Sequence, residues 1–183
     1  MKKLIIINGT MGVGKTTVSE RLYKSLENSF WLDGDSCWYM NPFVVNEENK
    51  KMVIENISFI LNNFIKNSFS DYIIFNWVIQ TDEIMNLVLD SLKLKGVDVH
   101  KITLMCSEEK LIERIARDIS KGIRDSESIK RSVDNLRLYE RMETLKINTD
   151  NKSVETIIEE IKKNNKMIMY LYRYVDYLIT MYI

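Results

Sequence analysis

An apolar run that leads into a glycine-rich loop is the feature that most restricts how this chain can fold. Residues 4–8 read Leu-Ile-Ile-Ile-Asn, typical of a buried strand, and residues 9–16 then follow the spacing G-x-x-x-x-G-K-[ST]. Beyond the loop, apolar residues recur at Val18, Leu22 and Leu26, the spacing of a helix. Strand, loop and helix in this order are the context in which the pattern binds phosphate. A glycine loop before an ordinary helix is the alternative.

The loop offers the groups that a nucleoside triphosphate and its metal ion need. Glycine tolerates the backbone conformations that turn several N–H groups toward one phosphate. We expect Lys15 to reach the β- and γ-phosphates and Thr16 to ligate a magnesium ion through its hydroxyl. The residues expected to bind the nucleotide are Gly9, Thr10, Met11, Gly12, Val13, Gly14, Lys15, Thr16 and Thr17.

Strand-like and helix-like segments alternate, which predicts an α/β fold with helices over a mainly parallel sheet. Strands are expected at 3–8, 29–33, 71–76, 97–106 and 145–148. Helices are expected at 15–27, 46–67, 81–95, 107–120, 127–142 and 153–164. We expect one domain over residues 1–164, because 183 residues that are 45% hydrophobic suffice for one good core.

Composition argues against several partners and compartments. Lys+Arg and Asp+Glu are equal at 26 each, so no overall charge attracts nucleic acid or an acidic membrane. Cys37 and Cys106 lack the spacing of a disulfide framework, and the apolar run at the N-terminus is too short for a signal peptide. We therefore expect a cytoplasmic protein that binds neither nucleic acid nor membrane.

Residues 165–183 differ from the rest of the chain because they are mostly apolar and aromatic. Met167, Leu171 and Tyr174 recur at helical spacing, which favours a docked helix. A strand or a homodimer contact is the alternative. Membrane contact is disfavoured, because the run is short for a membrane span and contains charged residues.

Two carboxylates follow the second expected strand. Asp33 and Asp35 flank a glycine at a strand end, where open α/β sheets build their active sites. We expect Asp33 to hold magnesium and Asp35 to orient or deprotonate the hydroxyl of an acceptor molecule. The same three residues are also typical of an ordinary polar turn.

The third expected strand ends at Asn76, where proteins with this loop often carry an acidic residue. An amide is a poor replacement for a carboxylate as a magnesium ligand, so more of that role is expected of Thr16 and Asp33. No D-x-x-G follows this strand, and residues 151–154 lack the aspartate of the guanine-binding pattern N-K-x-D. A GTPase is therefore disfavoured.

A basic helix runs into a glycine-containing loop near residue 122. Its basic residues include Arg114, Arg117, Lys121 and Arg124. Guanidinium groups suit the charge of a transferring phosphoryl group, so a lid at about 117–128 is expected, with Arg117 and Arg124 as the first candidates for catalysis. The alternative is a solvated face paired with the neighbouring acidic residues.

Aromatic residues concentrate at 36–43, before the second long helix, and Trp77 and Gln80 follow the third strand. A pocket of this composition suits a neutral, largely apolar acceptor. The aromatic side chains are equally consistent with a place in the core.

These residues resemble the small P-loop kinases, a group that includes adenylate-type, shikimate and gluconate kinases, chloramphenicol phosphotransferase and tunicamycin-resistance ATP-binding proteins. The resemblance rests on I-N-G-x-x-G-V-G-K-T-T at 7–17, L-D-G-D at 32–35, L-I-E-R-I-A-R-D at 111–118 with G-I-R at 122–124, and I-N-T-D at 147–150.

The resemblance implies a three-layer P-loop NTPase fold with a five-stranded parallel sheet in the order 2-3-1-4-5 and helices on both faces. It also implies ATP and Mg²⁺ as cofactors, Asp35 near the acceptor, Arg117 and Arg124 in a lid, and Asp150 near adenine. Asn76 departs from the family pattern. The R-x-P-x-Y signature of shikimate kinases is absent around Tyr139, which disfavours shikimate.

The sequence therefore predicts an ATP-dependent phosphotransferase that moves the γ-phosphoryl group to a hydroxyl or phosphate of a small molecule. The alternative is an ATP-binding protein without transfer activity, acting as a sensor or sequestering a ligand. Asn76 favours this alternative, and the sequence leaves the acceptor open.

Overall fold

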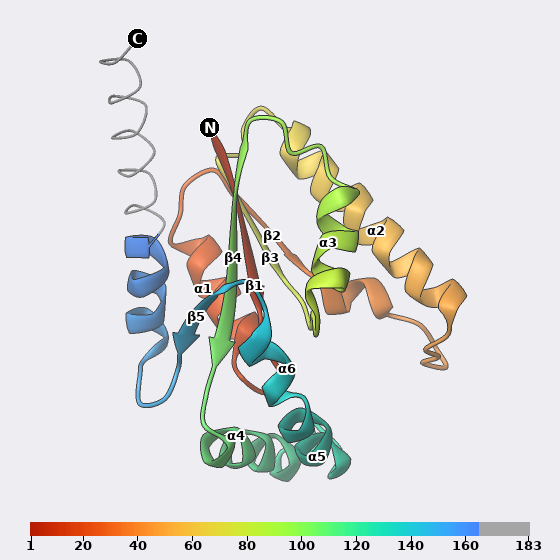
Figure 1. The fold of residues 1–183 in the computed structure, drawn as a ribbon, viewed down its shortest axis with the longest axis vertical. Coiled ribbons are helices and arrows are strands. Elements are labelled where there is room, and N and C mark those ends of the chain that lie inside the picture. Colours follow the sequence, from red (N-terminus) through yellow and green to blue (C-terminus); the bar gives the residue numbers. More distant parts are fainter. Residues whose placement is uncertain (165–183) are drawn as a thin grey trace.

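The computed structural model of the chain describes residues 1–164, which form a central sheet between two layers of helices (Figure 1). The sheet has five parallel strands in the order β2-β3-β1-β4-β5. They are β1 (Lys2–Asn8), β2 (Ser29–Asp33), β3 (Tyr72–Asn76), β4 (Val97–Met105) and β5 (Leu145–Asn148). The expected α/β class and the strand order implied by the family resemblance are confirmed.

The helices connect the strands and cover both faces of the sheet. They are α1 (Lys15–Lys24), α2 (Glu47–Lys66), α3 (Asp82–Asp90), α4 (Glu108–Ser120), α5 (Glu127–Asp134), α6 (Leu136–Arg141) and a helix over 154–164. A 3₁₀ helix, η1 (Gly34–Trp38), follows β2. No local pattern predicts η1, which the Asp33 carboxylate caps by accepting a hydrogen bond from the Asp35 backbone N–H.

Some expected helix bounds are wrong. The single helix expected over 127–142 is two helices that meet at Asn135, a residue type that competes poorly for helix interiors. Helices α1 and α3 end earlier than expected, with Ser25 and Ser91 as their C-terminal capping residues. Each of these serine hydroxyls donates to a carbonyl three residues earlier, which satisfies part of the helix end.

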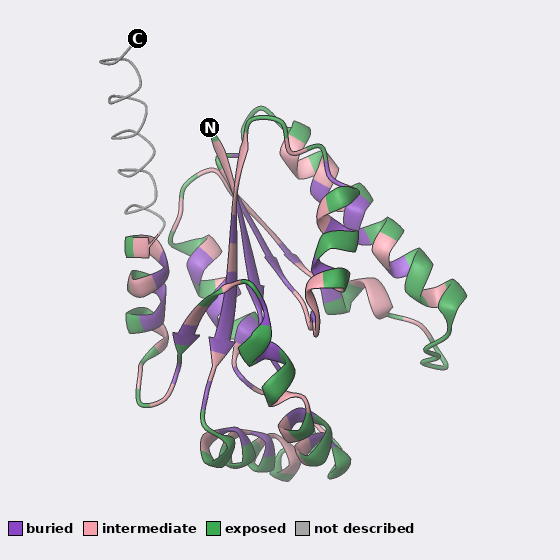
Figure 2. Cartoon of the chain, in the orientation of Figure 1, coloured by how far each residue is buried: buried purple, intermediate pink, exposed green. Residues whose placement is uncertain are grey.

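Strand β1 is buried on both faces and divides the core in two (Figure 2). Leu4 and Ile6 belong to the cluster formed with α2 and α3, whereas Ile5 and Ile7 belong to the cluster formed with α1, α4 and the helix over 154–164. Successive side chains of a strand point to opposite faces, so this continuous apolar run serves both layers.

The register of the strands brings the functional loops to one edge of the sheet. Ile7 lies opposite Asn76 on β3 and Ile102 on β4, while Asp33 lies opposite Asn76. Because all strands are parallel, the segments after β1, β2, β3 and β4 leave from the same edge (Figure 1).

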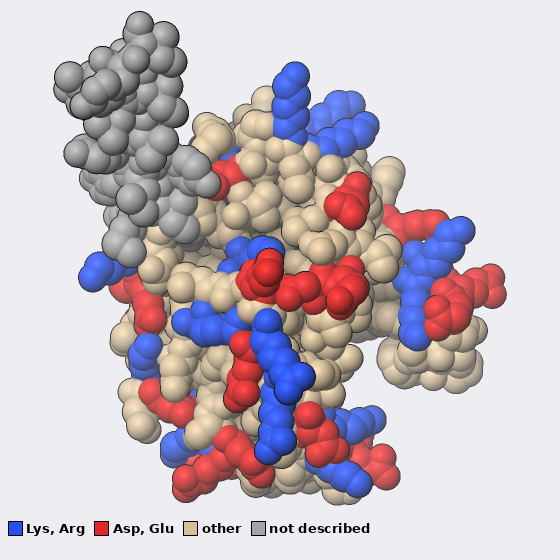
Figure 3. Space-filling view, viewed as in Figure 1, with Lys and Arg blue, Asp and Glu red and all other residues tan. Residues whose placement is uncertain are grey.

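Residues 165–183, for which we expect a docked helix or a dimer contact, lie outside the described residues. Among residues 1–164, no helix combines the length and the apolar character needed to cross a membrane. On the face shown in Figure 3, basic and acidic side chains are interspersed, in keeping with the equal numbers of the two charges.

The core makes a direct prediction about stability. Phe75 on β3 is fully buried, so Phe75→Ala should lower the free energy of unfolding by about 3–5 kcal/mol. Phe69, with 64% of its surface exposed, is the matched control, and Phe69→Ala should change it by about 0.5 kcal/mol or less. Urea denaturation measures both, and equal losses would contradict the assigned core.

Candidate active site

The phosphate loop (residues 9–16) joins β1 to α1 and packs against α4. Gly12 has a φ of +86°, in the region that favours glycine, and an added Cβ would lie 2.6 Å from Cγ1 of Ile115. Thr10 is buried and donates from its hydroxyl to the Ser132 carbonyl of α5 at 2.9 Å. The loop is therefore held between the sheet and the helices that follow β4.

Lys15 begins α1 with a buried side chain that reaches back across the loop. Its ammonium group donates to the Thr10 carbonyl at 3.1 Å. Burial lowers the pKa of Lys15 to about 8, although the charges of Asp35 and Asp33 act in the opposite direction. A buried cation with no ion pair of its own within the described structure is a ready partner for an anionic phosphate.

The two carboxylates after β2 occupy different surroundings. Asp33 accepts a hydrogen bond from the Thr16 hydroxyl at 2.8 Å with one oxygen and from the Asp35 N–H at 3.0 Å with the other. Asp35 lines the cleft, and its partial desolvation together with the charge of Asp33 raises its pKa. The two carboxylates therefore differ in their surroundings, and their separate roles stay a prediction.

Thr16 and Asp33 are the residues that could hold a magnesium ion. Both present hard oxygen donors at one point, which suits Mg²⁺, an ion usually held by one or two carboxylates together with substrate phosphates. Within residues 1–164, no group of three or more His, Cys, Asp and Glu side chains is placed to hold a metal ion.

A cleft of about 970 Å³ lies at this edge of the sheet. It brings together residues that follow four different strands: Met11, Gly12, Gly14, Lys15, Thr16, Thr17, Asp35, Trp38, Tyr39, Phe43, Val45, Trp77, Val78, Gln80, Arg114, Arg117, Asp118 and Arg124. Four residues expected to bind nucleotide do not line the cleft. Gly9, Thr10 and Val13 are buried members of the phosphate loop, and Asp150 lies after β5.

One side of the cleft is an aromatic wall, formed by Trp38, Tyr39, Phe43 and Trp77. The rings of Trp38 and Phe43 are 5.8 Å apart. Gly34 explains how Trp77 is placed, because an added Cβ at Gly34 would lie 2.6 Å from Cγ of the indole. The glycine between Asp33 and Asp35 is thus required by packing, and the wall is only in part a component of the core.

The arginines line the opposite side of the cleft. Arg117 on α4 pairs with Glu113 at 3.0 Å, and Arg124 in the following loop pairs with Asp118 at 2.8 Å. Both line the cleft within the expected lid, and both are paired with acidic neighbours. Their catalytic role stays a prediction.

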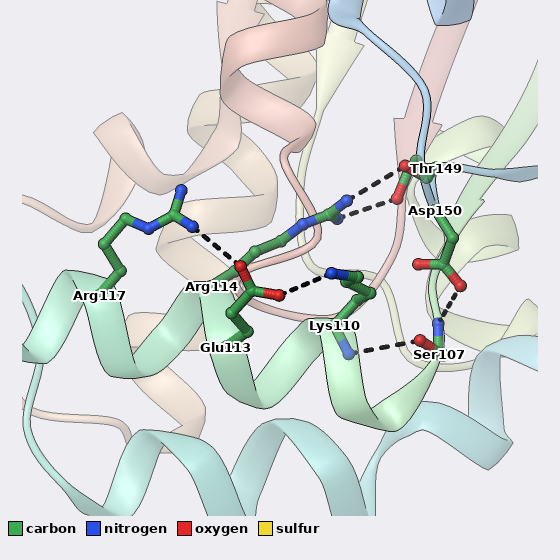
Figure 4. A network of polar contacts seen from close by, with 7 residues as sticks. All are labelled: Ser107, Lys110, Glu113, Arg114, Arg117, Thr149 and Asp150. Carbon is green, nitrogen blue, oxygen red and sulfur yellow. Dashed lines mark hydrogen bonds and ion pairs between the residues drawn. The ribbon is translucent and has the colours of Figure 1, made fainter.

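Hydrogen bonds hold the guanidinium group of Arg114 against the segment after β5 (Figure 4). Its guanidinium donates to the Val13 carbonyl at 3.2 Å and to the side chain and backbone oxygens of Thr149 at 2.9 and 3.1 Å. It thereby ties the phosphate loop to the segment after β5. From the sequence, Arg117 is the stronger candidate for a functional role. The only local feature that could indicate Arg114 is its position one turn closer to the start of the helix.

Asp150 serves the same junction (Figure 4). One carboxylate oxygen accepts from the Ser107 N–H at 2.9 Å, at the start of α4, while the other is buried without a partner in the described structure. This anchors the loop after β5 beside α4, and contact of Asp150 with adenine stays a prediction.

Asn76 is occupied by a structural contact. Its side-chain oxygen accepts a hydrogen bond from the Trp31 indole N–H at 2.6 Å, and the residue is buried. This hydrogen bond joins β3 to β2. The position that often carries an acidic residue in proteins with this loop therefore has a structural role here.

Gly34→Ala should disturb Trp77. The new Cβ would overlap the indole, so we expect a loss of about 1–3 kcal/mol in the free energy of unfolding and a shift in tryptophan emission. In a Trp77→Ala background the same change should cost far less. Urea denaturation of the four proteins measures this, and equal costs in both backgrounds would refute the packing explanation.

The lowered pKa of Lys15 predicts how the free energy of unfolding depends on pH. Its pKa of about 8 is below the ordinary 10.5, so between these values the unfolded chain binds more protons. Without ligands, the stability contributed by this residue should rise from about pH 8 to 10.5, by on the order of 3 kcal/mol. Lys15→Met should lack this rise. Denaturation of both proteins across this range measures it, and parallel curves would contradict the burial of a charged Lys15.

Solved structures with the same fold include small-molecule kinases. The tunicamycin resistance protein of Deinococcus radiodurans is 16% identical with a TM-score of 0.63, covering 91% of this chain and 96% of its own. The gluconokinase of Sinorhizobium meliloti is 14% identical with a TM-score of 0.65, covering 93% and 95%. The shikimate kinase of Acinetobacter baumannii is 18% identical with a TM-score of 0.60, covering 91% and 94%. At these identities the likeness shows the fold.

No curated protein matches the chain. The AAA domain family, in contrast, matches residues 5–135, a span that includes the phosphate loop, both carboxylates after β2 and the arginines of the expected lid. Together with the fold of the P-loop kinases, this match confirms the resemblance seen in the sequence: the chain belongs to the AAA domain family.

Proposed function

We propose that the protein is an ATP-dependent phosphotransferase that moves the γ-phosphoryl group to a hydroxyl or phosphate of a small molecule. The observation that supports it best is a single cleft in which the phosphate loop, Asp35 and the aromatic wall meet. A donor and an acceptor bound in this cleft would lie side by side, and phosphoryl transfer depends chiefly on positioning and charge stabilisation.

The donor side is formed by the phosphate loop and α1. Lys15 and the backbone N–H groups of the loop bind the phosphates of ATP, and the positive end of α1 adds to this attraction. Thr16 and Asp33 hold Mg²⁺, which neutralises part of the phosphate charge when it is bound.

On the acceptor side, Asp35 orients the hydroxyl and takes its proton. Its raised pKa makes it a better proton acceptor than an aspartate with the ordinary pKa. Arg117 and Arg124 exchange their acidic partners for the phosphates as the lid closes, which neutralises charge that develops on the γ-phosphate.

A second candidate is an ATP-binding protein without transfer activity, acting as a sensor or sequestering a ligand. Asn76 favours it, because the position offers no carboxylate and its amide is engaged by Trp31. The Deinococcus protein with the same fold is a tunicamycin resistance protein, and resistance is compatible with either candidate. We place either activity in the cytoplasm, where the free thiols of Cys37 and Cys106 stay reduced.

Two substitutions separate the roles in the site. Lys15→Ala should weaken ATP binding by about tenfold or more, because a charge-assisted contact to phosphate is lost. Asp35→Asn should leave ATP binding nearly unchanged and lower phosphoryl transfer by about a hundredfold or more. Asp90→Asn, on the exposed end of α3, is the matched control and should change neither quantity.

Titration calorimetry with ATP·Mg²⁺ and release of ADP in the presence of a panel of nucleosides, sugars and antibiotics measure the two effects. Equal losses of ATP binding in both variants would contradict the assigned roles. Binding of ATP without ADP release for any acceptor would favour the second candidate.

A further inference from the structure

The two sides of the cleft differ because different strands build them. The phosphate loop follows the central strand β1, and the arginines follow β4 on one side of it. Trp38, Tyr39, Phe43 and Val45 follow β2, while Trp77, Val78 and Gln80 follow β3 on the other side. The sheet order therefore keeps an arginine-bearing side apart from an aromatic side.

The aromatic wall contains side chains that are exposed in the open cleft. Tyr39 is 88% exposed and Phe43 65% exposed, although both line the cleft and Phe43 leans on Trp38. The apolar surface of these rings is in contact with water. A bound ring that covers this surface would contribute favourable free energy to binding. Their position beside the phosphate loop makes a small molecule the occupant that fits.

The wall carries a single ionised group. Asp35 is negative, Gln80 is neutral, and among the described residues that line the cleft every lysine and arginine lies on the side of the loop and α4. Two of these arginines are paired with acidic neighbours. Arg114 is engaged by backbone and threonine oxygens. An anionic acceptor on the wall would lie beside the negative charge of Asp35 and be repelled by it, while the cations that line the cleft belong to the phosphate loop and to the segment that follows β4.

From these contacts we infer that the acceptor is an uncharged molecule with a planar ring and a free hydroxyl. This rests on the proposed function and narrows it. The ring lies against the aromatic wall and the hydroxyl faces Asp35. The hydroxyl oxygen forms a bond to the γ-phosphorus as the bond from that phosphorus to the bridging oxygen of ADP breaks, and the hydroxyl proton passes to Asp35.

Matched pairs of compounds test the inference on the full chain. Thymidine is compared with thymidine monophosphate, and phenyl glucoside with phenyl glucuronide, while methyl glucoside lacks the ring. Binding is measured by titration calorimetry with ADP·Mg²⁺ saturating the donor side. We expect at least one neutral ring compound to bind about tenfold or more tightly than both its anionic partner and the ringless glucoside.

The inference is overturned if no neutral ring compound binds more tightly than its anionic partner. Measuring phosphorylation of the same compounds distinguishes failure of the inference from failure of the proposed function. Preferential binding of the neutral ring compounds without transfer supports the inference while the kinase proposal fails. Efficient phosphorylation of the anionic partners supports the kinase proposal while the inference fails.

Tyr39→Ala tests the wall itself. Its exposed side chain can be removed without opening the core, so the variant should fold and bind ATP as before but bind the neutral ring compound about tenfold more weakly. Phe69→Ala removes another exposed aromatic residue, one that lies outside the cleft, and should leave this binding unchanged. Equal affinities in the two variants would refute the wall as the ring-binding surface.

Discussion

The central position of β1 is the constraint on which the rest of the structure depends. Its parallel pairing with β3 on one side and β4 on the other fixes where every following loop leaves the sheet. The strand can occupy this position because its apolar residues satisfy both faces of the sheet. The phosphate loop is consequently delivered to the middle of the edge, between loops that the other strands supply.

This arrangement divides the cleft into two chemistries. Toward β4, Arg114 joins the phosphate loop to the segment after β5 through hydrogen bonds, so the region that would hold the nucleotide is already tied to its neighbours. Toward β2 and β3, Gly34 lets Trp77 pack closely while Tyr39 stays exposed. A preorganised donor side and an open acceptor side suit an enzyme whose chemistry is mainly positioning.

Local patterns in the sequence predicted much of this. The apolar strands, the loop spacing and the alternation of elements indicated the α/β fold, and the family resemblance supplied the strand order. The break at Asn135 was missed because the apolar spacing continues through it and no glycine or proline marks it. The helix ends at Ser25 and Ser91 depend on weak side-chain signals.

The missed features of the site share one cause. The contact of Gly34 with Trp77 joins residues from two loops, and the hydrogen bonds of Arg114 span residues far apart in the chain. The same is true of the bond from Trp31 that occupies Asn76. Such pairings follow from the tertiary arrangement, so neither periodicity nor local spacing could indicate them.

We propose that Thr16 and Asp33 form the magnesium position beside a nucleotide held by the phosphate loop. The most direct measurement is the affinity for ATP, by titration calorimetry, as Mg²⁺ is increased in the unmodified protein and in Asp33→Asn. We predict that Mg²⁺ tightens ATP binding in the unmodified protein and that Asp33→Asn loses most of this gain while still binding ATP. The same gain in both proteins would contradict the account.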